Sequence, residues 1–309
     1  MKGIIAATYA PMHTNGLLNT DVIVEYGRYL MSNGVSGAFV NGSTGDFVSL
    51  STSERMKLIE AWTALREQGF YVINHVGHTN LREAQELALH SADMVDATAA
   101  LPPFYFRPKT VDELVHYCAE IASAAPDIPF YYYHIPVLTR VNLPMLAFLD
   151  TAKKRIPNFA GIKYTEDNLE DFKQCMEKGG DTVDMFFGID EKYVDSLLVG
   201  SQGWVGSTYN HLAPLYHDVA KYNSQGNVDA AKQLQGKAIR FVQILETMGG
   251  YHGGGKSFMR HLGLDMGPSR FPHRTFNDDE LLKAFKLFKK EGISEYFPEP
   301  CHRDSDKRI

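Results

Sequence analysis

The chain has 309 residues, of which 44% are hydrophobic and 22% are charged, and its formal net charge at pH 7 is -6. This length and composition suffice for one large globular domain or two ordinary ones, and they exclude a chain that is disordered throughout. The negative net charge gives no global attraction for nucleic acid or for an anionic membrane surface, so we expect the partner to be a small molecule.

Short apolar runs of β-type residues alternate with helical patterns along most of the chain. We expect strands at residues 3–9, 36–41, 71–76, 93–99, 128–133, 159–164, 184–188 and 203–207. We expect helices at residues 20–33, 52–68, 80–91, 110–124, 143–153, 167–178, 190–199 and 213–224. Some helices have entry signals, and Ser51 and Glu54 have the spacing of a capping box.

This alternation predicts an α/β fold, and its eight repeats favour closure into a (β/α)8 TIM barrel. An open doubly wound sheet is the alternative. Beyond residue 225 the pattern is helical, with an amphipathic stretch at residues 279–290. We therefore expect a barrel that carries the active site at residues 1–225 and a C-terminal helical extension at residues 226–309, whose last residues, 303–309, fray.

The cysteine pattern and the absence of long apolar runs indicate a cytoplasmic protein. Cys118, Cys175 and Cys301 are far apart in the sequence and form no CxxC pair, so we expect reduced thiols and neither a disulfide framework nor a zinc knuckle. No run approaches the roughly 18 apolar residues of a transmembrane helix. The apolar run at residues 3–7 is short for a signal peptide and is interpreted as the first strand.

Two further motifs favour structural explanations over functional ones. Residues 250–257 match the P-loop pattern GxxxxGK[ST], but they follow a helical pattern rather than a buried strand, so we expect a glycine-rich connection between helices. His75 and His78 could form a metal pair, but no third ligand is evident nearby. We expect hydrogen-bonded structural or pocket-lining histidines there, and no bound metal.

A lysine stands inside the apolar run at residues 159–164. An unperturbed lysine with a pKa of about 10.4 is neutral in about one molecule in 2,500 at pH 7, and only the neutral amine attacks a carbonyl. Burial would lower the pKa of Lys163 and make it a plausible Schiff-base nucleophile. From this segment alone, the alternative is a lysine at the strand end whose ammonium reaches water or a carboxylate.

Polar groups also follow four other predicted strands, and in a barrel the carboxyl ends of the strands meet at one rim. The segments are Gly42-Ser43-Thr44-Gly45 after the second strand, Tyr133-His134 at the end of the fifth, Gly188-Ile189-Asp190-Glu191 after the seventh and Gly206-Ser207-Thr208-Tyr209-Asn210 after the eighth. Thr165 lies two residues after Lys163 and therefore on the same face. An amine, a phenol, a nest for a carboxylate and acceptors for hydroxyls together indicate imine chemistry on a 2-oxo acid with a hydroxylated tail. A plain turn at residues 42–45 and a charged first helical turn at residues 190–191 are the alternatives.

These segments, with Tyr133-His134-Ile135-Pro136 and Gly161-Ile162-Lys163-Tyr164-Thr165, resemble motifs of the N-acetylneuraminate lyases. Those lyases belong to the dihydrodipicolinate synthase superfamily of pyruvate-dependent class I aldolases. The resemblance runs from about residue 3 to 225. It implies reversible cleavage of N-acetylneuraminate (sialic acid) to N-acetylmannosamine and pyruvate through an imine on Lys163, with Tyr133 as proton relay and without a metal or a dissociable cofactor.

The resemblance also implies further site residues and an assembly. Ser43 and Thr44 would bind the substrate carboxylate. The sugar chain would be held by Thr165, Gly188, Asp190, Glu191 and Ser207. Tyr105 resembles the tyrosine that this superfamily inserts into a neighbouring subunit's site, in homotetramers that are dimers of dimers.

Four positions bear on specificity. Leu138 stands where the lysine-biosynthetic synthases have a substrate-binding arginine, and Arg140 lies two residues later, which disfavours dihydrodipicolinate synthase activity. Asp46 stands where a glutamate is usual, and Trp204 replaces a small residue and is expected to crowd the eighth strand or to narrow the sugar pocket. The other functions considered are a related aldolase for another sugar-derived 2-oxo acid, a non-catalytic barrel that binds keto acids, and a metal-dependent barrel hydrolase.

Overall fold

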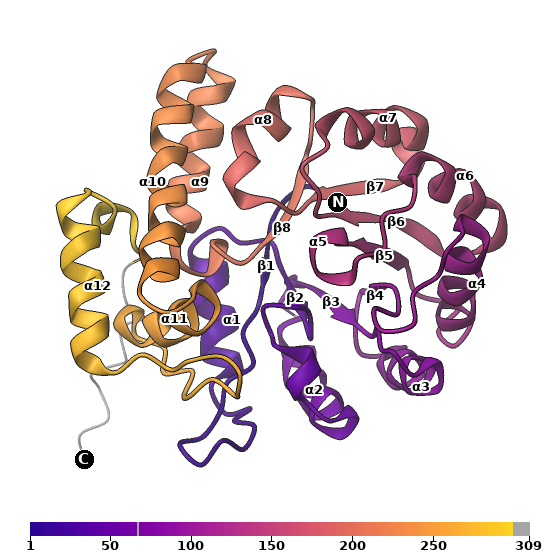
Figure 1. Cartoon of the computed structure of the whole chain (residues 1–309), viewed down its shortest axis with the longest axis horizontal. Coiled ribbons are helices and arrows are strands. Elements are labelled where there is room, and N and C mark those ends of the chain that lie inside the picture. The colour runs from indigo at the N-terminus through magenta and orange to yellow at the C-terminus, as the bar shows by residue number, and fades with distance from the viewer. Residues whose placement is uncertain (67, 299–309) are drawn as a thin grey trace.

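Eight parallel strands close into a barrel in the computed structural model, which describes residues 1–66 and 68–298 (Figure 1). The strands are β1 (Gly3–Ala7), β2 (Gly37–Val40), β3 (Tyr71–His75), β4 (Ala97–Ala100), β5 (Phe130–His134), β6 (Phe159–Tyr164), β7 (Asp184–Phe187) and β8 (Gly203–Gly206). Each strand pairs with its neighbours in sequence, and β1 also pairs with β8, which closes the barrel. The predicted TIM barrel is therefore confirmed, and the open sheet is excluded.

Helices surround the barrel, and further helices follow it on one side (Figure 1). The helices up to the last strand are α1 (Ile23–Ser32), α2 (Thr52–Arg66), α3 (Leu81–Ser91), α4 (Val111–Ala122), α5 (Pro136–Thr139), α6 (Met145–Arg155), α7 (Leu169–Gly179) and α8 (Tyr193–Leu198). After β8 come α9 (Tyr209–Ser224), α10 (Val228–Thr247), α11 (Tyr251–Phe258) and α12 (Asp278–Lys290). Short 3₁₀ helices are η1 (Phe47–Ser49), η2 (Gly180–Thr182), η3 (Asp190–Lys192), η4 (Met259–Leu262) and η5 (Ser294–Tyr296). Because α10 packs along α9, the C-terminal helices extend the ring rather than stand apart from it. The predicted boundary near residue 225 stays a prediction.

The buried side chains form an inner core inside the barrel and an outer core between the strands and the helices. Tyr131 and Tyr133 belong to the inner core, whereas Tyr132 lies in the outer core and packs on Phe148 with ring centres 4.4 Å apart. Successive residues of a strand face opposite sides, so the same alternation holds all around the barrel. It places every second side chain of β5 and β6 in the interior, where the site is built.

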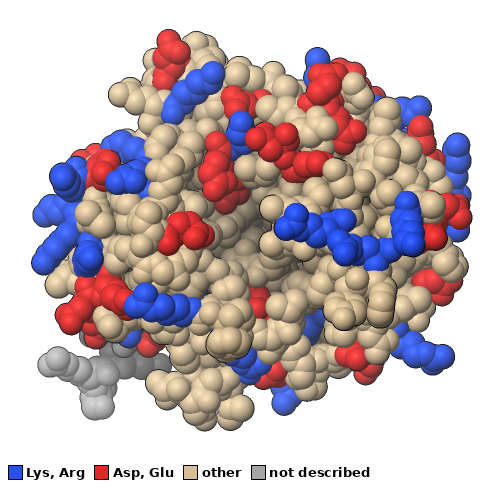
Figure 2. Space-filling model, viewed as in Figure 1, with Lys and Arg blue, Asp and Glu red and all other residues tan. Residues whose placement is uncertain are grey.

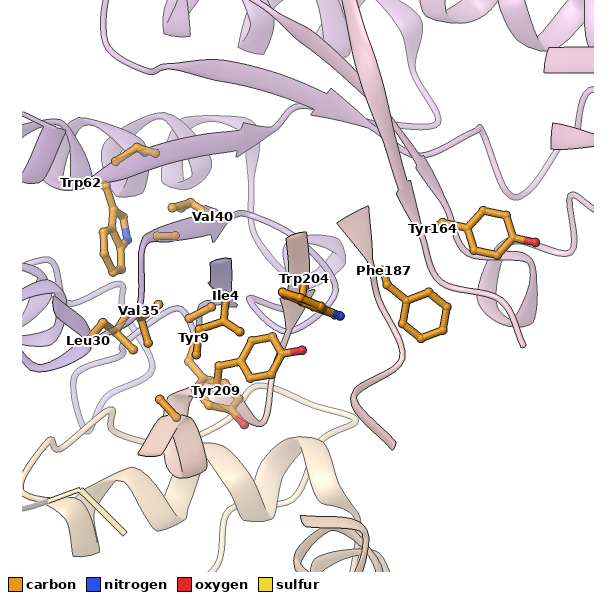
Figure 3. Close-up of a cluster of buried hydrophobic side chains, with 14 of the residues drawn as sticks. Ile4, Tyr9, Leu30, Val35, Val40, Trp62, Tyr164, Phe187, Trp204 and Tyr209 are labelled. Carbon is orange, nitrogen blue, oxygen red and sulfur yellow. The ribbon is translucent and has the colours of Figure 1, made fainter. Parts of the chain in front are cut away.

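Trp204 lies in the outer core, which contradicts the expectation that it narrows the sugar pocket. Figure 3 shows it among buried side chains that include Tyr9 and Tyr209. Its ring packs on Tyr193 with ring centres 4.7 Å apart, and its Nε1 donates a hydrogen bond of 2.8 Å to Ser196 Oγ. The reason is the parity of the strand, because the inward position belongs to the next residue, Val205. The indole fills space between β8 and α8.

The glycine-rich segment at residues 250–257 is helix α11 rather than a connection between helices. A Cβ on Gly253 would lie 1.9 Å from the carbonyl oxygen of Arg274, so only glycine lets this helix approach that backbone. The Nζ of Lys256 is buried and donates to the carbonyl oxygen of Pro268 at 2.7 Å. The glycines of the P-loop match thus permit close packing of this helix, and the lysine of the match is hydrogen-bonded to the protein's own backbone.

The structure confirms one local signal found in the sequence, whereas some boundaries of the expected elements differ from those observed. The capping box of Ser51 and Glu54 is present, with backbone-to-side-chain hydrogen bonds of 2.9 and 3.2 Å. The strand expected at residues 93–99 begins only at residue 97, and α9 begins before residue 213 because two helical segments merge across a kink at Leu212.

The structure also bears on the expectations about a transmembrane helix, the cysteines and the C-terminal tail. No helix in the described part of the chain is long and apolar enough to cross a membrane. Cys118 and Cys175 are buried free thiols, whereas Cys301 and residues 303–309 lie outside the described residues.

Candidate active site

Lys163 lies in the barrel interior at the carboxyl end of β6, where only 4% of the residue is exposed. Its Cα pairs in register with that of Tyr133 on β5. The Nζ lies 3.8 Å from the centre of the Tyr133 ring and 4.1 Å from the centre of the Phe39 ring. Among the described residues no hydrogen bond or ion pair holds this amine. Burial lowers the pKa of Lys163 to about 7, a shift that the charge of Asp190 opposes.

The phenol of Tyr133 points toward the loop that follows β2. Its hydroxyl lies 3.5 Å from Ser43 Oγ. Burial raises the pKa of Tyr133 to about 12, although the hydroxyls of Ser43 and Thr165 oppose the rise. The phenol is therefore protonated at neutral pH and can act in proton transfer only by passing one proton on as it receives another.

The loop after β2 turns so that its amides are free for a ligand. Asp46 N donates to the carbonyl oxygen of Ser43 at 3.0 Å, and Phe47 N donates to that of Gly42 at 3.4 Å. The amides of Ser43, Thr44 and Gly45 make no hydrogen bond with the described residues. Successive free N–H groups in a turn form a concavity suited to an anion. The geometry thus matches the expected nest for a carboxylate.

Asp46 makes local contacts that stabilise this loop. It adopts the left-handed conformation, with a φ of 51°, and its carboxylate accepts a hydrogen bond from Ser49 Oγ. The other carboxylate oxygen lies 3.7 Å from His273 Nε2. The shorter acid is therefore fully engaged in local contacts.

Thr165 and Gly188 lie directly against each other where β6 and β7 end. A Cβ on Gly188 would lie 2.1 Å from Thr165 Oγ1, so a larger residue would push the two strand ends apart. Thr165 Oγ1 is buried and makes no hydrogen bond within 3.5 Å among the described residues, although it lies close enough to the Tyr133 phenol to oppose the rise of that phenol's pKa. An unsatisfied buried hydroxyl at a strand end is a candidate ligand contact.

Asp190 is a buried carboxylate, only 6% exposed, at the start of η3. Its Oδ2 accepts hydrogen bonds from Thr208 N at 2.9 Å and from Thr208 Oγ1 at 2.7 Å. Its Oδ1 is buried without a partner among the described residues. Burial raises the pKa of Asp190 to about 6, and the charge of Glu191 contributes to this rise as the second cause. Glu191 is half-buried, and Gln235 Nε2 fixes its backbone by donating to its carbonyl oxygen at 2.7 Å.

Ser207 follows β8 and receives a hydrogen bond from the C-terminal helices. Tyr251, the first residue of α11, donates from its hydroxyl to Ser207 Oγ at 3.1 Å. The sequence reasoning missed this contact, because it placed residues 250–257 in a connection outside the barrel. The only signal was a tyrosine at the edge of a glycine-rich run.

A cavity of about 380 Å³ is lined by Ser43, by several apolar side chains and by two histidines. Its lining residues include the apolar Phe47, Phe104 and Leu138, and His252 and His273, whose rings stack with centres 3.9 Å apart. Figure 2 shows this face of the molecule hollowed near its middle, with acidic side chains along one side and basic ones along another. Neither histidine was expected at the site.

The other predicted positions lie as follows. His75 is buried, and its Nδ1 lies 2.8 Å from the carbonyl oxygen of Asn41 while its Nε2 accepts from Leu101 N at 3.2 Å. It is the hydrogen-bonded structural histidine that was expected. No group of three His, Cys, Asp or Glu side chains within the described ranges is placed to hold a metal ion. Tyr105 is 74% exposed, and its ring packs edge-on against Phe106 with ring centres 5.0 Å apart.

A closed (β/α)8 barrel with a buried amine beside a phenol at the carboxyl ends of its strands has the arrangement of a lysine-dependent aldolase. A sequence profile of the dihydrodipicolinate synthetase family matches residues 1–291. The chain belongs to this family, and it is a lyase of the aldolase type.

Characterised relatives resemble the chain over nearly its whole length. N-acetylneuraminate lyase from Homo sapiens is 39% identical, over 93% of this chain and 92% of the relative. The rat enzyme of the same name, from Rattus norvegicus, is 36% identical over 97% and 98% of the two chains. The solved structure of Proteus mirabilis N-acetylneuraminate lyase superposes with a TM-score of 0.90 at 33% identity, covering 95% of this chain and 99% of that one.

Proposed function

We propose that this protein cleaves N-acetylneuraminate reversibly to N-acetylmannosamine and pyruvate through an imine on Lys163. The observation that carries the proposal is the amine of Lys163, buried against the Tyr133 ring at 3.8 Å with a pKa of about 7. An amine that is half neutral near physiological pH can attack a ketone without a separate base. The names of the relatives support the choice of substrate.

The proposed reaction begins when the neutral Nζ of Lys163 attacks C2 of the open-chain sugar acid. Loss of water with uptake of one proton from solvent gives the protonated imine, which accepts the electron pair of the C3–C4 bond as that bond breaks. Tyr133 takes the proton of the C4 hydroxyl while it passes its own proton to the substrate carboxylate, and N-acetylmannosamine leaves as the aldehyde. The enamine takes up at C3 the proton that the carboxylate received, and water then adds to the resulting imine, which releases pyruvate and a proton and restores the neutral amine. No metal or dissociable cofactor takes part.

The proposed binding roles follow the polarity of the rim. Ser43 and Thr44 hold the carboxylate of the substrate with the free amides of their loop. The sugar chain is held on the opposite side by Thr165, Gly188, Asp190, Glu191 and Ser207. Leu138 at the mouth offers no charge to a second carboxylate, so aspartate semialdehyde, the co-substrate of dihydrodipicolinate synthase, is disfavoured.

We further propose a cytoplasmic homotetramer, a dimer of dimers, in which Tyr105 enters the site of a neighbouring subunit. Tyr105 and Phe106 are 74% and 86% exposed, and such adjacent aromatic side chains suit a contact between copies of the chain. The buried free thiols of Cys118 and Cys175 suit a reducing compartment. Sedimentation of the wild type and of Tyr105→Ala tests the assembly, and a monomeric wild type would exclude it.

The chemical proposal is tested by incubating the protein with pyruvate, reducing with borohydride and mapping the adduct by mass spectrometry. We expect a reduced pyruvyl group on Lys163 and none on Lys163→Ala. Absence of the adduct from the wild type would overturn the imine mechanism and favour a barrel that only binds keto acids. Pyruvate release from N-acetylneuraminate is then compared with release from other 2-oxo sugar acids, and faster turnover of another acid would make it the substrate.

A further inference from the structure

The first residue of α11 joins the C-terminal helices to the end of β8. Tyr251 is half-buried, and its ring packs edge-on against Phe241 and His211, with ring centres 6.4 Å apart in both pairs. Burial raises the pKa of Tyr251 well above its usual value, so the phenol keeps its proton. The phenol thus has a proton to donate at neutral pH, and its hydrogen bond to Ser207 Oγ makes it the donor of this pair.

Because Tyr251 donates to the oxygen of the Ser207 hydroxyl, that hydroxyl keeps its own proton for another partner. Ser207 Oγ accepts from Tyr251 at 3.1 Å, so its own proton is free to point elsewhere. The backbone of Ser207 is held separately, because its carbonyl oxygen accepts from Asn210 Nδ2 at 2.7 Å. Tyr251 thus affects which way the serine hydroxyl points rather than where the strand end lies.

An acceptor without a partner lies at the same strand end. Asp190 Oδ1 is buried and unpaired among the described residues, while Oδ2 is bound by Thr208. A Cβ built on Gly206, the residue before Ser207, would lie 1.6 Å from this Oδ1, so the carboxylate lies against the end of β8. The end of β8 thus carries one free donor, the Ser207 hydroxyl, and lies against one unsatisfied acceptor, Asp190 Oδ1.

We propose that Tyr251 is a positioning residue that turns the Ser207 hydroxyl into a donor, so that Ser207 donates to the hydroxylated tail of the substrate while Asp190 Oδ1 accepts from that tail. This inference rests on the proposed function and deepens it, because it makes the C-terminal extension part of the specificity of the barrel. A substrate with no hydroxyl beyond C4 gains nothing from Tyr251.

The test compares Tyr251→Phe, Ser207→Ala and the double variant in both reaction directions. The loss of one hydrogen bond should raise the KM for N-acetylneuraminate and for N-acetylmannosamine about 3- to 10-fold, with kcat and the KM for pyruvate unchanged within about twofold. The double variant should match Ser207→Ala. A short 4-hydroxy-2-oxo acid without further hydroxyls should be cleaved equally well by the wild type and by Tyr251→Phe.

The matched control is Tyr132→Phe, which removes a buried hydroxyl that has no hydrogen-bond partner among the described residues and lies outside the barrel. It should leave every KM unchanged. Equal losses for pyruvate and sugar in Tyr251→Phe, additive effects in the double variant, or a lowered Tm with no change in KM would each overturn the proposal. A wild type that traps pyruvate on Lys163 but does not cleave N-acetylneuraminate would instead refute the substrate assignment.

Discussion

The lowered pKa of Lys163 predicts a specific pH dependence of imine formation. With a pKa of about 7, about half of the molecules carry the neutral amine at pH 7, compared with about one in 2,500 for an unperturbed lysine. Burial thus raises the concentration of the nucleophile on the order of a thousandfold. Below the pKa each pH unit removes about nine tenths of the neutral amine, so the rate should fall about tenfold per unit below pH 7 and level off above about pH 8.

The assay is the initial rate of borohydride-trapped pyruvyl adduct on Lys163, measured by mass spectrometry from about pH 5 to about pH 10. Lys163→Ala gives the background at each pH, and free lysine gives the intrinsic pH dependence of reduction. A rate that keeps rising through pH 9 without a plateau would mean that the pKa of Lys163 is not lowered. In that case burial of Nζ beside the rings of Tyr133 and Phe39 would not disfavour the ammonium form of Lys163.

Two further predictions concern the scaffold. Trp204→Ala should lower the free energy of unfolding in urea by about 3 to 5 kcal/mol, because it opens a cavity in the outer core. The KM for N-acetylneuraminate should stay within about twofold, and a large change in KM would place the indole at the pocket after all. Glu54→Gln should cost about 1 to 3 kcal/mol at pH 7, because Arg270 Nη1 binds Glu54 Oε2 at 2.9 Å and Arg270 lowers the pKa of Glu54 to about 2. That stability is present above the ordinary pKa of glutamate and is lost as the pH falls toward 2, so wild type and variant should unfold alike near pH 2, and a difference that persists there would contradict the assignment to charge.

The sequence predicted the barrel well because its information is periodic. Apolar runs, turn signals and helical patterns alternate eight times, and only closed or open parallel sheets fit such an order. The predicted strand boundaries were wrong where residues are buried but do not pair with a neighbouring strand. Val95 is fully buried but precedes β4, so the apolar pattern wrongly predicted that Val95 belongs to the strand. A pattern reports which side chains leave water, whereas a strand is defined by hydrogen bonds between backbones.

The site was predictable where it is built from strand ends. Lys163 and Tyr133 lie near the carboxyl ends of their strands and Asp190 follows another, and because these ends must meet at one rim, the topology alone brings the three residues together. Tyr251 and His252 were not predictable in this way, since they reach the rim from a helix that packs against the barrel after the last strand. The docking of such a helix depends on tertiary packing, and the close approach of Gly253 to Arg274 is visible only in three dimensions.

The interior of the barrel holds its amine with aromatic rings rather than with a carboxylate in direct contact. A carboxylate beside Nζ would favour the ammonium and raise the pKa of Lys163, which would leave too little neutral amine for attack. Full burial without compensation would make the charged form too costly, and the protonated imine of the proposed reaction also carries that charge. The faces of Phe39 and Tyr133 attract a cation moderately, while Asp190 acts through space. Neutral amine and cationic imine are thereby both accessible, which is what the proposed imine mechanism requires.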